Sequence, residues 1–278
     1  MEKARSFYES YGRRRFENPL EEEYDRLAAR WKVEVMCRSL SGFRINSILE
    51  FGCGSGFVLL AFRNSLSPAR MVGIDLSSAQ LAMASRIVPN GSFVRGDDST
   101  LAGLRGRFDL VLLVDILEHV GDPTSVLRSA ARLGTLVMVK MPLERRLIDK
   151  MWFHVRGRQY PLGLDSHRAG HLVEWNLTQA LSLLREARME VMSWQTADPP
   201  VGLRYHALFR RSSRGLIREL LASLNRGLEI ATCERWPRAH AYLYGTSLFA
   251  LCRGTAPDTG GAAYARIGDD NGTSAAQP

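Results

Sequence analysis

Three glycines at alternate positions constrain this chain more than any other feature. Gly52, Gly54 and Gly56 lie in the stretch SILEFGCGSGFVLLAF, residues 47–62. Apolar residues precede them as in a buried strand, and a run with helical spacing follows them. Glycine permits positive φ and lets a ligand approach the backbone closely. A strand, a glycine-rich turn and a helix in this order predict a nucleotide site.

The rest of the chain alternates in the same way. Strand-like runs are expected at 46–51, 71–75, 92–95, 108–114 and 134–141, and helices near 56–66, 77–87 and 123–132. A further helix and strand are expected over 176–196, and a last strand over 241–253. Such alternation predicts an α/β fold with a mainly parallel sheet that helices cover on both faces.

The sequence suggests a division into three parts. Apolar residues recur at helical spacing from Glu22 to Leu40, which indicates an amphipathic helix before the glycine turn. The last residues are mostly Gly, Ala, Thr, Ser and Asp, a composition that does not build a core. The expected parts are an N-terminal helical lid segment (1–45), one domain (46–253) with insertions at 144–171 and 201–240, and a disordered tail (254–278).

The basic balance of the chain, with a formal net charge of +8, raises the question of an anionic partner. The arginines are scattered, and the only tight run, Arg13 to Arg15, is followed by Glu21 to Glu23. We therefore interpret the charge as solvated surface, and we do not expect a nucleic-acid partner. An anionic small molecule is the alternative.

The sequence predicts a cytoplasmic protein. No apolar run approaches the roughly 20 residues of a membrane helix, and the first residues lack the apolar core of a secretory signal. The four cysteines are far apart, so reduced thiols are expected rather than a disulfide framework or a zinc site. Weak contact of the basic stretch 145–158 with a membrane surface is a minor alternative.

Acidic residues around the glycine turn decide which nucleotide fits. A dinucleotide fingerprint is G-x-G-x-x-G, but Phe57 stands where the third glycine would fall. Glu50, two residues before the first glycine, would repel a pyrophosphate and favour a cationic head. Asp75 ends the next strand and is placed for ribose hydroxyls. Asp97, with Asp98 beside it, follows the third strand and is placed for an adenine amino group.

Together these features resemble those of the class I S-adenosylmethionine-dependent methyltransferases. The matching stretches are LEFGCGSG (49–56), GIDLS (73–77), GDDSTL (96–101) and FDLVLLVDILEHVGDP (108–123). The resemblance implies a Rossmann-like, doubly wound, seven-stranded and mostly parallel sheet whose last strand is antiparallel, with helical lid insertions. It implies S-adenosylmethionine as cofactor. The implied cofactor-binding residues are Glu50, Gly52, Cys53, Gly54, Asp75, Leu76, Asp97, Asp98, Val114 and Tyr11.

Three interpretations compete for the end of the fourth strand, where Asp115, Glu118 and His119 follow one another as D-x-x-E-H. They are structural residues, or His119 or a later histidine is a general base, or the group binds a divalent metal. The spacing resembles the E-x-x-E-H of ubiquinone-pathway and small-RNA methyltransferases, which add a downstream histidine, here His171. Because aspartate replaces the first glutamate, we do not favour a metal.

The catalytic candidates are therefore His119, His171 and Glu118, and the less favoured metal set adds Asp115. His154 and His167 are alternatives to His171. The substrate pocket is expected from the insertions, with Met151, Trp152, Phe153, Tyr160 and Trp175 as walls. Arg156, Arg158 and Arg168 are candidates for an anionic group.

The predicted function is methylation of a small-molecule acceptor, aromatic or anionic, most simply at oxygen and in specialised or quinone-like metabolism. Within the family, the sequence resembles the small-molecule type represented by the ubiquinone-biosynthesis O-methyltransferases. An RNA or protein methyltransferase and a cofactor-binding protein without catalysis are the alternatives from other classes.

Overall fold

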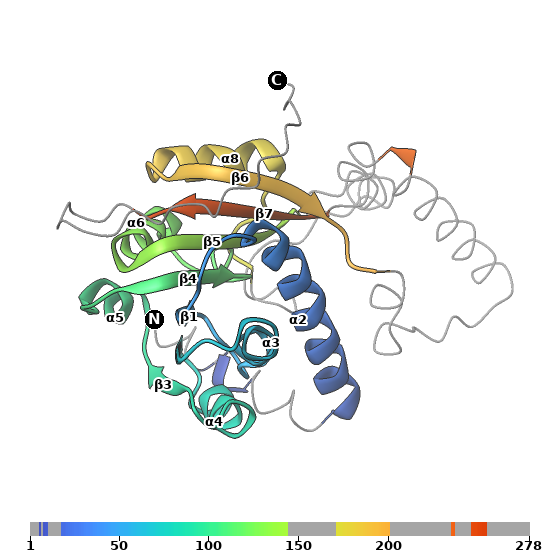
Figure 1. Ribbon diagram of the computed structural model, residues 1–278, viewed down its shortest axis with the longest axis vertical. Helices are drawn as coiled ribbons and strands as arrows, with labels where there is room; N and C mark the ends of the chain where they lie inside the picture. The colour runs from blue at the N-terminus through green and yellow to red at the C-terminus, as the bar shows by residue number, and fades with distance from the viewer. Residues whose placement is uncertain are drawn as a thin grey trace, which may run out of the picture.

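Seven strands form one sheet at the centre of the molecule (Figure 1). The computed structural model describes residues 6, 8–10, 18–143, 171–200, 235–236 and 246–254. The strands are β1 (Ser47–Phe51), β2 (Arg70–Asp75), β3 (Ser92–Arg95), β4 (Phe108–Val114), β5 (Gly134–Leu143), β6 (Glu190–Ala197) and β7 (Thr246–Arg253). They lie in the order β3-β2-β1-β4-β5-β7-β6. Of these described strands, only β7 runs antiparallel to its neighbours β5 and β6, which confirms the predicted fold class.

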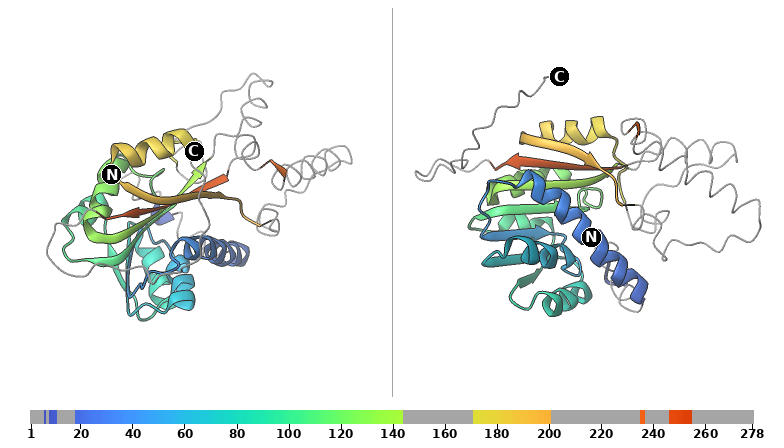
Figure 2. Two further views of the ribbon diagram at one scale, coloured as in Figure 1. Left: turned by 45° about the horizontal axis from the view of Figure 1, so that its top comes forward. Right: turned by 45° about the vertical axis from the view of Figure 1, so that its right-hand side comes forward.

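Helices cover both faces of the sheet (Figures 1 and 2). The described helices are α2 (Pro19–Ser39), α3 (Phe57–Leu66), α4 (Ser78–Ile87), α5 (Asp98–Gly103), α6 (Pro123–Leu133) and α8 (Leu177–Glu186). One apolar core packs α2, α3 and α4 against one face, and a second packs α5, α6 and α8 against the other. Along β4, Leu112 belongs to the first core and Leu113 to the second. Strands buried on both faces explain the continuous apolar runs in the sequence.

Side-chain caps fix where several helices begin. Ser77 accepts a hydrogen bond from the Gln80 amide at the start of α4, and Asp122 accepts one from the Ser125 amide at the start of α6. Both caps were indicated by the sequence. The short helix α5 was not expected. Within the first five strands, the expected bounds agree with the structure to within two residues.

Much of the predicted lid lies outside the described residues. This holds for most of the insertions at 144–171 and 201–240 and for nearly all of the tail at 254–278. The division into three parts therefore stays a prediction. None of the helices in the described ranges has both the length and the apolar character needed to cross a bilayer.

The strand order reverses between β1 and β4. From β1 the chain moves outward to β2 and β3, and it then returns to β4 on the other side of β1. In open α/β sheets, ligands bind at the carboxyl ends of the strands beside such a reversal. Glu50, Asp75 and Asp115 all lie at this edge, in or just after β1, β2 and β4.

Candidate active site

The glycine turn lies at the carboxyl end of β1. Gly52, Gly54 and Gly56 have φ angles of 77°, 52° and 80°, a region that favours glycine. A Cβ at Gly52 would lie 2.6 Å from Cδ1 of Ile116, whereas a Cβ at Gly54 would meet nothing closer than Oε1 of Gln80 at 3.9 Å. Gly52 is therefore required by the packing of the protein itself, and Gly54 leaves its backbone accessible to a ligand.

Glu50 is buried behind this turn. The residue is 2% exposed, and its Oε2 has no hydrogen-bond partner. Burial raises the pKa of Glu50 well above its usual range; the charge of Lys32 opposes this shift, while Asp75 and Asp115 add to it. A buried carboxylate oxygen without a partner is unfavourable. A bound cationic group would supply the partner and lower the pKa.

Asp75 ends β2 and is held by backbone amides. Its Oδ2 accepts a hydrogen bond from the Gly54 amide at 2.8 Å, and its Oδ1 accepts one from the Ser77 amide at 2.9 Å. Burial raises the pKa of Asp75, and these amides oppose that shift. The carboxylate therefore has a fixed orientation beside the glycine turn.

Asp97 has a structural task that the sequence did not predict. Its Oδ1 accepts hydrogen bonds from the amides of Ser99 and Thr100 and so caps α5. The bond from the Ser99 hydroxyl is the largest of the contributions that lower the pKa of Asp97. Because all of these bonds use Oδ1, capping does not exclude a contact between Oδ2 and a ligand. Asp98 is exposed in the first turn of α5.

The other predicted cofactor residues line the same edge. Cys53 is buried, with its sulfur against Gly73 of β2, as expected of a residue that fills the turn. Val114 is buried at the end of β4, and Leu76 is half-buried after Asp75. The predicted residues outside the described ranges are Tyr11, His154, His167, Met151, Trp152, Phe153, Tyr160, Arg156, Arg158 and Arg168.

A second group of polar side chains follows β4. Glu118, His119 and His171 each offer a potential ligand atom, and these atoms all lie within 4.8 Å of one another. The imidazoles of the two histidines meet edge to face, with ring centroids 4.7 Å apart. The Leu172 amide donates to the carbonyl oxygen of Glu118 at 2.7 Å, which ties the two distant segments together. We call these three residues the Glu–His–His cluster.

The chemistry of the Glu–His–His cluster suits a proton or a cation. Glu118 is 1% exposed, and neither of its carboxylate oxygens has a hydrogen-bond partner. Burial raises the pKa of Glu118, and the charge of Asp115 adds to this effect. One carboxylate and two imidazoles are donors that Zn²⁺, Mn²⁺ and Fe²⁺ accept. A cation there would give the buried carboxylate a partner, so the donor set fits a divalent metal.

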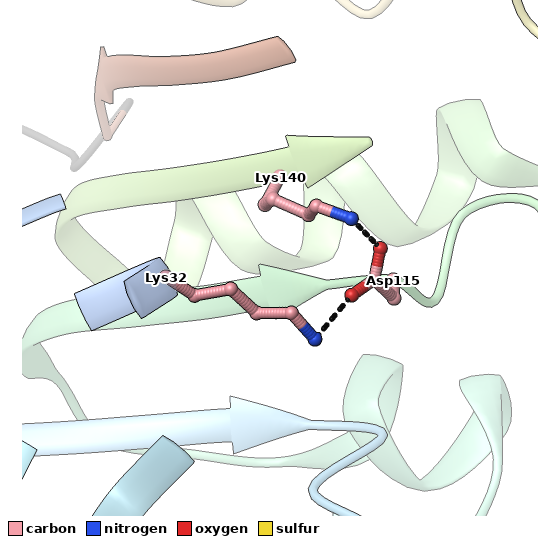
Figure 3. A network of polar contacts seen from close by, with 3 residues as sticks. All are labelled: Lys32, Asp115 and Lys140. Atoms are coloured by element: carbon pink, nitrogen blue, oxygen red, sulfur yellow. Dashed lines mark hydrogen bonds and ion pairs between the residues drawn. The ribbon is translucent and has the colours of Figure 1, made fainter. Parts of the chain in front are cut away.

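Asp115 is not part of the Glu–His–His cluster and is held by two lysines (Figure 3). Its Oδ2 lies 2.7 Å from Nζ of Lys32 in α2, and its Oδ1 pairs with Nζ of Lys140 in β5. Burial alone would raise the pKa of Asp115, but the two ammonium groups hold it well below its usual range. A carboxylate engaged in this way is a poor metal ligand. Of the four predicted metal ligands, Glu118, His119 and His171 therefore form the cluster, and Asp115 belongs to the lysine network instead.

The N-terminal segment also reaches the site. The Tyr8 hydroxyl lies 2.9 Å from Nδ1 of His119, and Oε2 of Glu9 accepts a hydrogen bond of 2.9 Å from the Ser78 amide at the start of α4. Sequence reasoning missed Lys32, Lys140 and the contact of Tyr8 with His119. One usable indication was the rarity of lysine, which occurs only at Lys3, Lys32, Lys140 and Lys150.

Comparisons with known proteins agree with this arrangement. A family model described as a methyltransferase domain matches residues 48–134, from β1 to the start of β5. This range holds the glycine turn, the acids that follow it and the D-x-x-E-H stretch, all on the sheet described above. The match over these residues, together with the fold, supports a class I S-adenosylmethionine-dependent methyltransferase domain.

Among the sequence relatives of this chain are two ubiquinone biosynthesis O-methyltransferases. The one from Bordetella pertussis is 34% identical over 108 residues, which cover 37% of this chain and 42% of the relative. The one from Rhodopseudomonas palustris is 33% identical over 134 residues, which cover 46% of this chain and 52% of the relative. The chain thus spans about half, or less, of the length of the curated relatives it matches.

Solved structures extend the similarity of fold to most of this chain. Magnesium protoporphyrin IX methyltransferase from Synechocystis with bound SAH has a TM-score of 0.55 at 14% identity and covers 90% of this chain and 97% of its own. The [4+2]-cyclase SpnF has a TM-score of 0.52 at 18% identity, with 83% and 82% covered. At these identities the similarity establishes the fold alone.

The family match does not cover the whole candidate site. Glu50, Asp75, Asp97 and most of the Glu–His–His cluster fall within residues 48–134. Its other member, His171, lies outside, and so do the residues that contact His119 and Asp115. Those residues are Tyr8, Lys32 and Lys140.

Proposed function

We propose that this protein transfers a methyl group from S-adenosylmethionine to an oxygen of a small-molecule acceptor. The observation that carries the proposal is the buried Oε2 of Glu50, which has no partner and lies beside the glycine turn. A carboxylate in this state suits the ammonium group of the cofactor's methionine end. A pyrophosphate would be repelled by it.

The cofactor roles follow from position at the sheet edge. Glu50 binds the ammonium group, Gly52 and Gly54 offer backbone contact, and Asp75 binds the ribose hydroxyls. Asp97 and Asp98 receive the adenine amino group, with Leu76 and Val114 beside the nucleoside, Cys53 in the turn and Tyr11 over the cofactor. When bound, S-adenosylmethionine supplies an electrophilic methyl group on a sulfonium, so the protein mainly has to position the acceptor.

The Glu–His–His cluster is proposed to act on the acceptor. A hydroxyl attacks the methyl carbon only as it loses its proton, and an imidazole with an ordinary pKa near 6.5 is suited to receive that proton. His119 and His171 are therefore the proposed general bases. Glu118, buried at their side, orients the imidazoles and stabilises the positive charge that the proton brings.

Metal-assisted transfer by the same residues is the second candidate. Two observations favour it: the three potential ligand atoms lie within 4.8 Å of one another, and both oxygens of Glu118 are without a partner. Glu118, His119 and His171 would hold the ion, which would lower the pKa of a bound hydroxyl. Asp115 is left out of this set because Lys32 and Lys140 engage it.

The proposed acceptor is an aromatic or anionic small molecule in quinone-like or specialised metabolism, in the cytoplasm. Support comes from the names of the sequence relatives, which are ubiquinone biosynthesis O-methyltransferases. Two other outcomes would count against the proposal. One is methylation of RNA or protein, and the other is catalysis of a different reaction on the same fold, for which the [4+2]-cyclase SpnF is a precedent.

Titration calorimetry with S-adenosylmethionine and S-adenosylhomocysteine tests the cofactor part. Glu50→Gln and Asp75→Asn should each weaken binding of S-adenosylmethionine at least about tenfold, since each removes a charge-assisted hydrogen bond of about 1.5–3 kcal/mol. Asp122→Asn is the matched control, because asparagine caps a helix as well as aspartate. Equal affinity in all four proteins would refute the cofactor assignment.

A panel of acceptors with methyl-labelled S-adenosylmethionine tests the reaction. Label should pass to a hydroxylated aromatic compound and not to RNA or protein, and His119→Ala and His171→Ala should lower the rate. Activity that survives strong chelation would reject the metal candidate and keep the general base. Cofactor binding without transfer to any acceptor would reject methylation itself.

A further inference from the structure

We propose that Tyr8 is a positioning residue for His119: its hydroxyl oxygen accepts a hydrogen bond from Nδ1–H and thereby leaves the imidazole lone pair on Nε2. This inference rests on the proposed function, because that function gives His119 a role in acceptor activation. The tautomer itself is measurable without any reaction.

The contact between the two side chains is specific. The Tyr8 hydroxyl lies 2.9 Å from Nδ1 of His119, a hydrogen-bond distance, and the rings meet edge to face at 87° with centroids 5.7 Å apart. The tautomer of a neutral histidine is set by the hydrogen bond that its other nitrogen makes. A tyrosine oxygen that accepts at Nδ1 therefore determines which nitrogen can take a proton or a cation.

The position of Tyr8 is fixed from outside the Glu–His–His cluster. Its chain neighbour Glu9 accepts a hydrogen bond of 2.9 Å from the Ser78 amide, at the first residue of α4. A carboxylate at a helix N-terminus is stabilised by the amides and by the helix dipole. Glu9 thus holds the segment beside Asp75, while Tyr8 reaches across to His119, 111 residues away in sequence.

The proposed function also calls for this direction of the hydrogen bond. Nδ1 of His119 is engaged by Tyr8, and potential ligand atoms of Glu118 and His171 lie within 4.8 Å of a ring nitrogen of His119. An Nε2–H would place a proton where the proposed function requires a lone pair. In metal sites, mutating the residue that bonds to the second nitrogen of a ligating histidine typically lowers metal affinity about 10- to 100-fold.

Spectroscopy of the histidines tests the proposal directly. The full chain is labelled with ¹⁵N-histidine and kept free of cofactor and metal, and long-range ¹H–¹⁵N spectra report the tautomer of each of its 6 histidines. His119→Gln assigns the His119 signals by their loss. We expect Nδ1–H for His119 in the unmodified protein and a shift toward Nε2–H in Tyr8→Phe, which removes only the oxygen.

Tyr24→Phe is the matched control and should leave the His119 signals unchanged. An Nε2–H tautomer in the unmodified protein would overturn the proposal, and so would an unchanged tautomer in Tyr8→Phe. Either result would make Tyr8 a packing residue.

A second experiment measures the binding of Co²⁺ alone to the protein, monitored through the absorption bands of the ion. Tyr8→Phe should weaken Co²⁺ binding about tenfold, and Tyr24→Phe should not. If the unmodified protein binds no Co²⁺, the metal candidate fails while the spectra still decide the role of Tyr8. If the spectra fail and Co²⁺ binds equally to all variants, the Tyr8 proposal fails while the metal candidate stands.

Discussion

The proposed cofactor side and the proposed acceptor side of the sheet edge are built in different ways. On the cofactor side, the amides of Gly54 and Ser77 hold Asp75, and amides within three residues hold Asp97. On the acceptor side, the contacts come from far along the chain: Asp115 pairs with lysines of α2 and β5, and His119 meets Tyr8.

The first kind of site is specified by a short stretch of sequence, whereas the second depends on the tertiary packing of distant segments. A carboxylate held by neighbouring amides is positioned as soon as its turn forms, so a short motif suffices to specify it. A carboxylate held by two distant lysines is positioned only when a helix and two strands have packed together. Substitutions on the first side should therefore act locally, and those on the second should affect several elements at once.

Gly52→Ala should have the largest effect, through packing on the cofactor side. The new Cβ would lie 2.6 Å from Ile116 at a φ of 77°, so both a clash and left-handed strain oppose it. We expect the free energy of unfolding to fall by about 2–4 kcal/mol in urea titrations. Gly103→Ala, where a Cβ meets nothing within 4 Å, should change it by less than about 0.5 kcal/mol. Equal effects would contradict the packing role of Gly52.

Asp115→Asn tests the acceptor side by leaving two lysines without their carboxylate. The lysine side chains are 20% and 6% exposed and that of Asp115 is 28% exposed, so solvent moderates the effect. We expect a loss of about 2 kcal/mol. Glu190→Gln, which breaks the exposed pair with Arg253, should cost less than about 0.5 kcal/mol. Similar losses in the two variants would show that the lysine network adds little.

The Asp115 contribution should also depend on pH. Because the folded protein holds the pKa of Asp115 below the unfolded value of about 3.9, the stabilisation is present above that value and is lost as the pH falls below it. The difference in unfolding free energy between the unmodified protein and Asp115→Asn should shrink as the pH falls below about 4. A difference that grows on acidification would reverse the assigned sign.

Replacements of Asp97 give the smallest effect on stability and separate its two roles. Asp97→Ala removes the cap of α5 and should lower the unfolding free energy by about 1 kcal/mol. Asp97→Asn keeps the cap and should cost only a few tenths of a kcal/mol, yet it should weaken S-adenosylmethionine binding if the carboxylate meets the adenine. Equal cofactor affinity in Asp97→Asn and the unmodified protein would leave capping as its role.

The difference between local and long-range contacts also explains which features could be predicted from the sequence. The strands, the caps at Ser77 and Asp122 and the edge position of Glu50 and Asp75 follow from local patterns, and the structure has all of them. Lys32 could not be placed, since its reach depends on how α2 docks against the sheet. For the same reason Asp115 was grouped with Glu118 by spacing alone, although the lysines draw it into another set of contacts.

The place of β7 in the sheet has a consequence for biosynthesis. This strand, Thr246–Arg253, lies between β5 and β6 and pairs with both. On the ribosome, β6 therefore lacks its partner among the described strands until residue 246 and those after it have emerged, and the edge of β5 that pairs with β7 stays open for the same time. Open edges invite pairing with other chains. The nascent protein is most vulnerable to aggregation just before its last strand is complete, and a chaperone that binds extended strands would protect it at that stage.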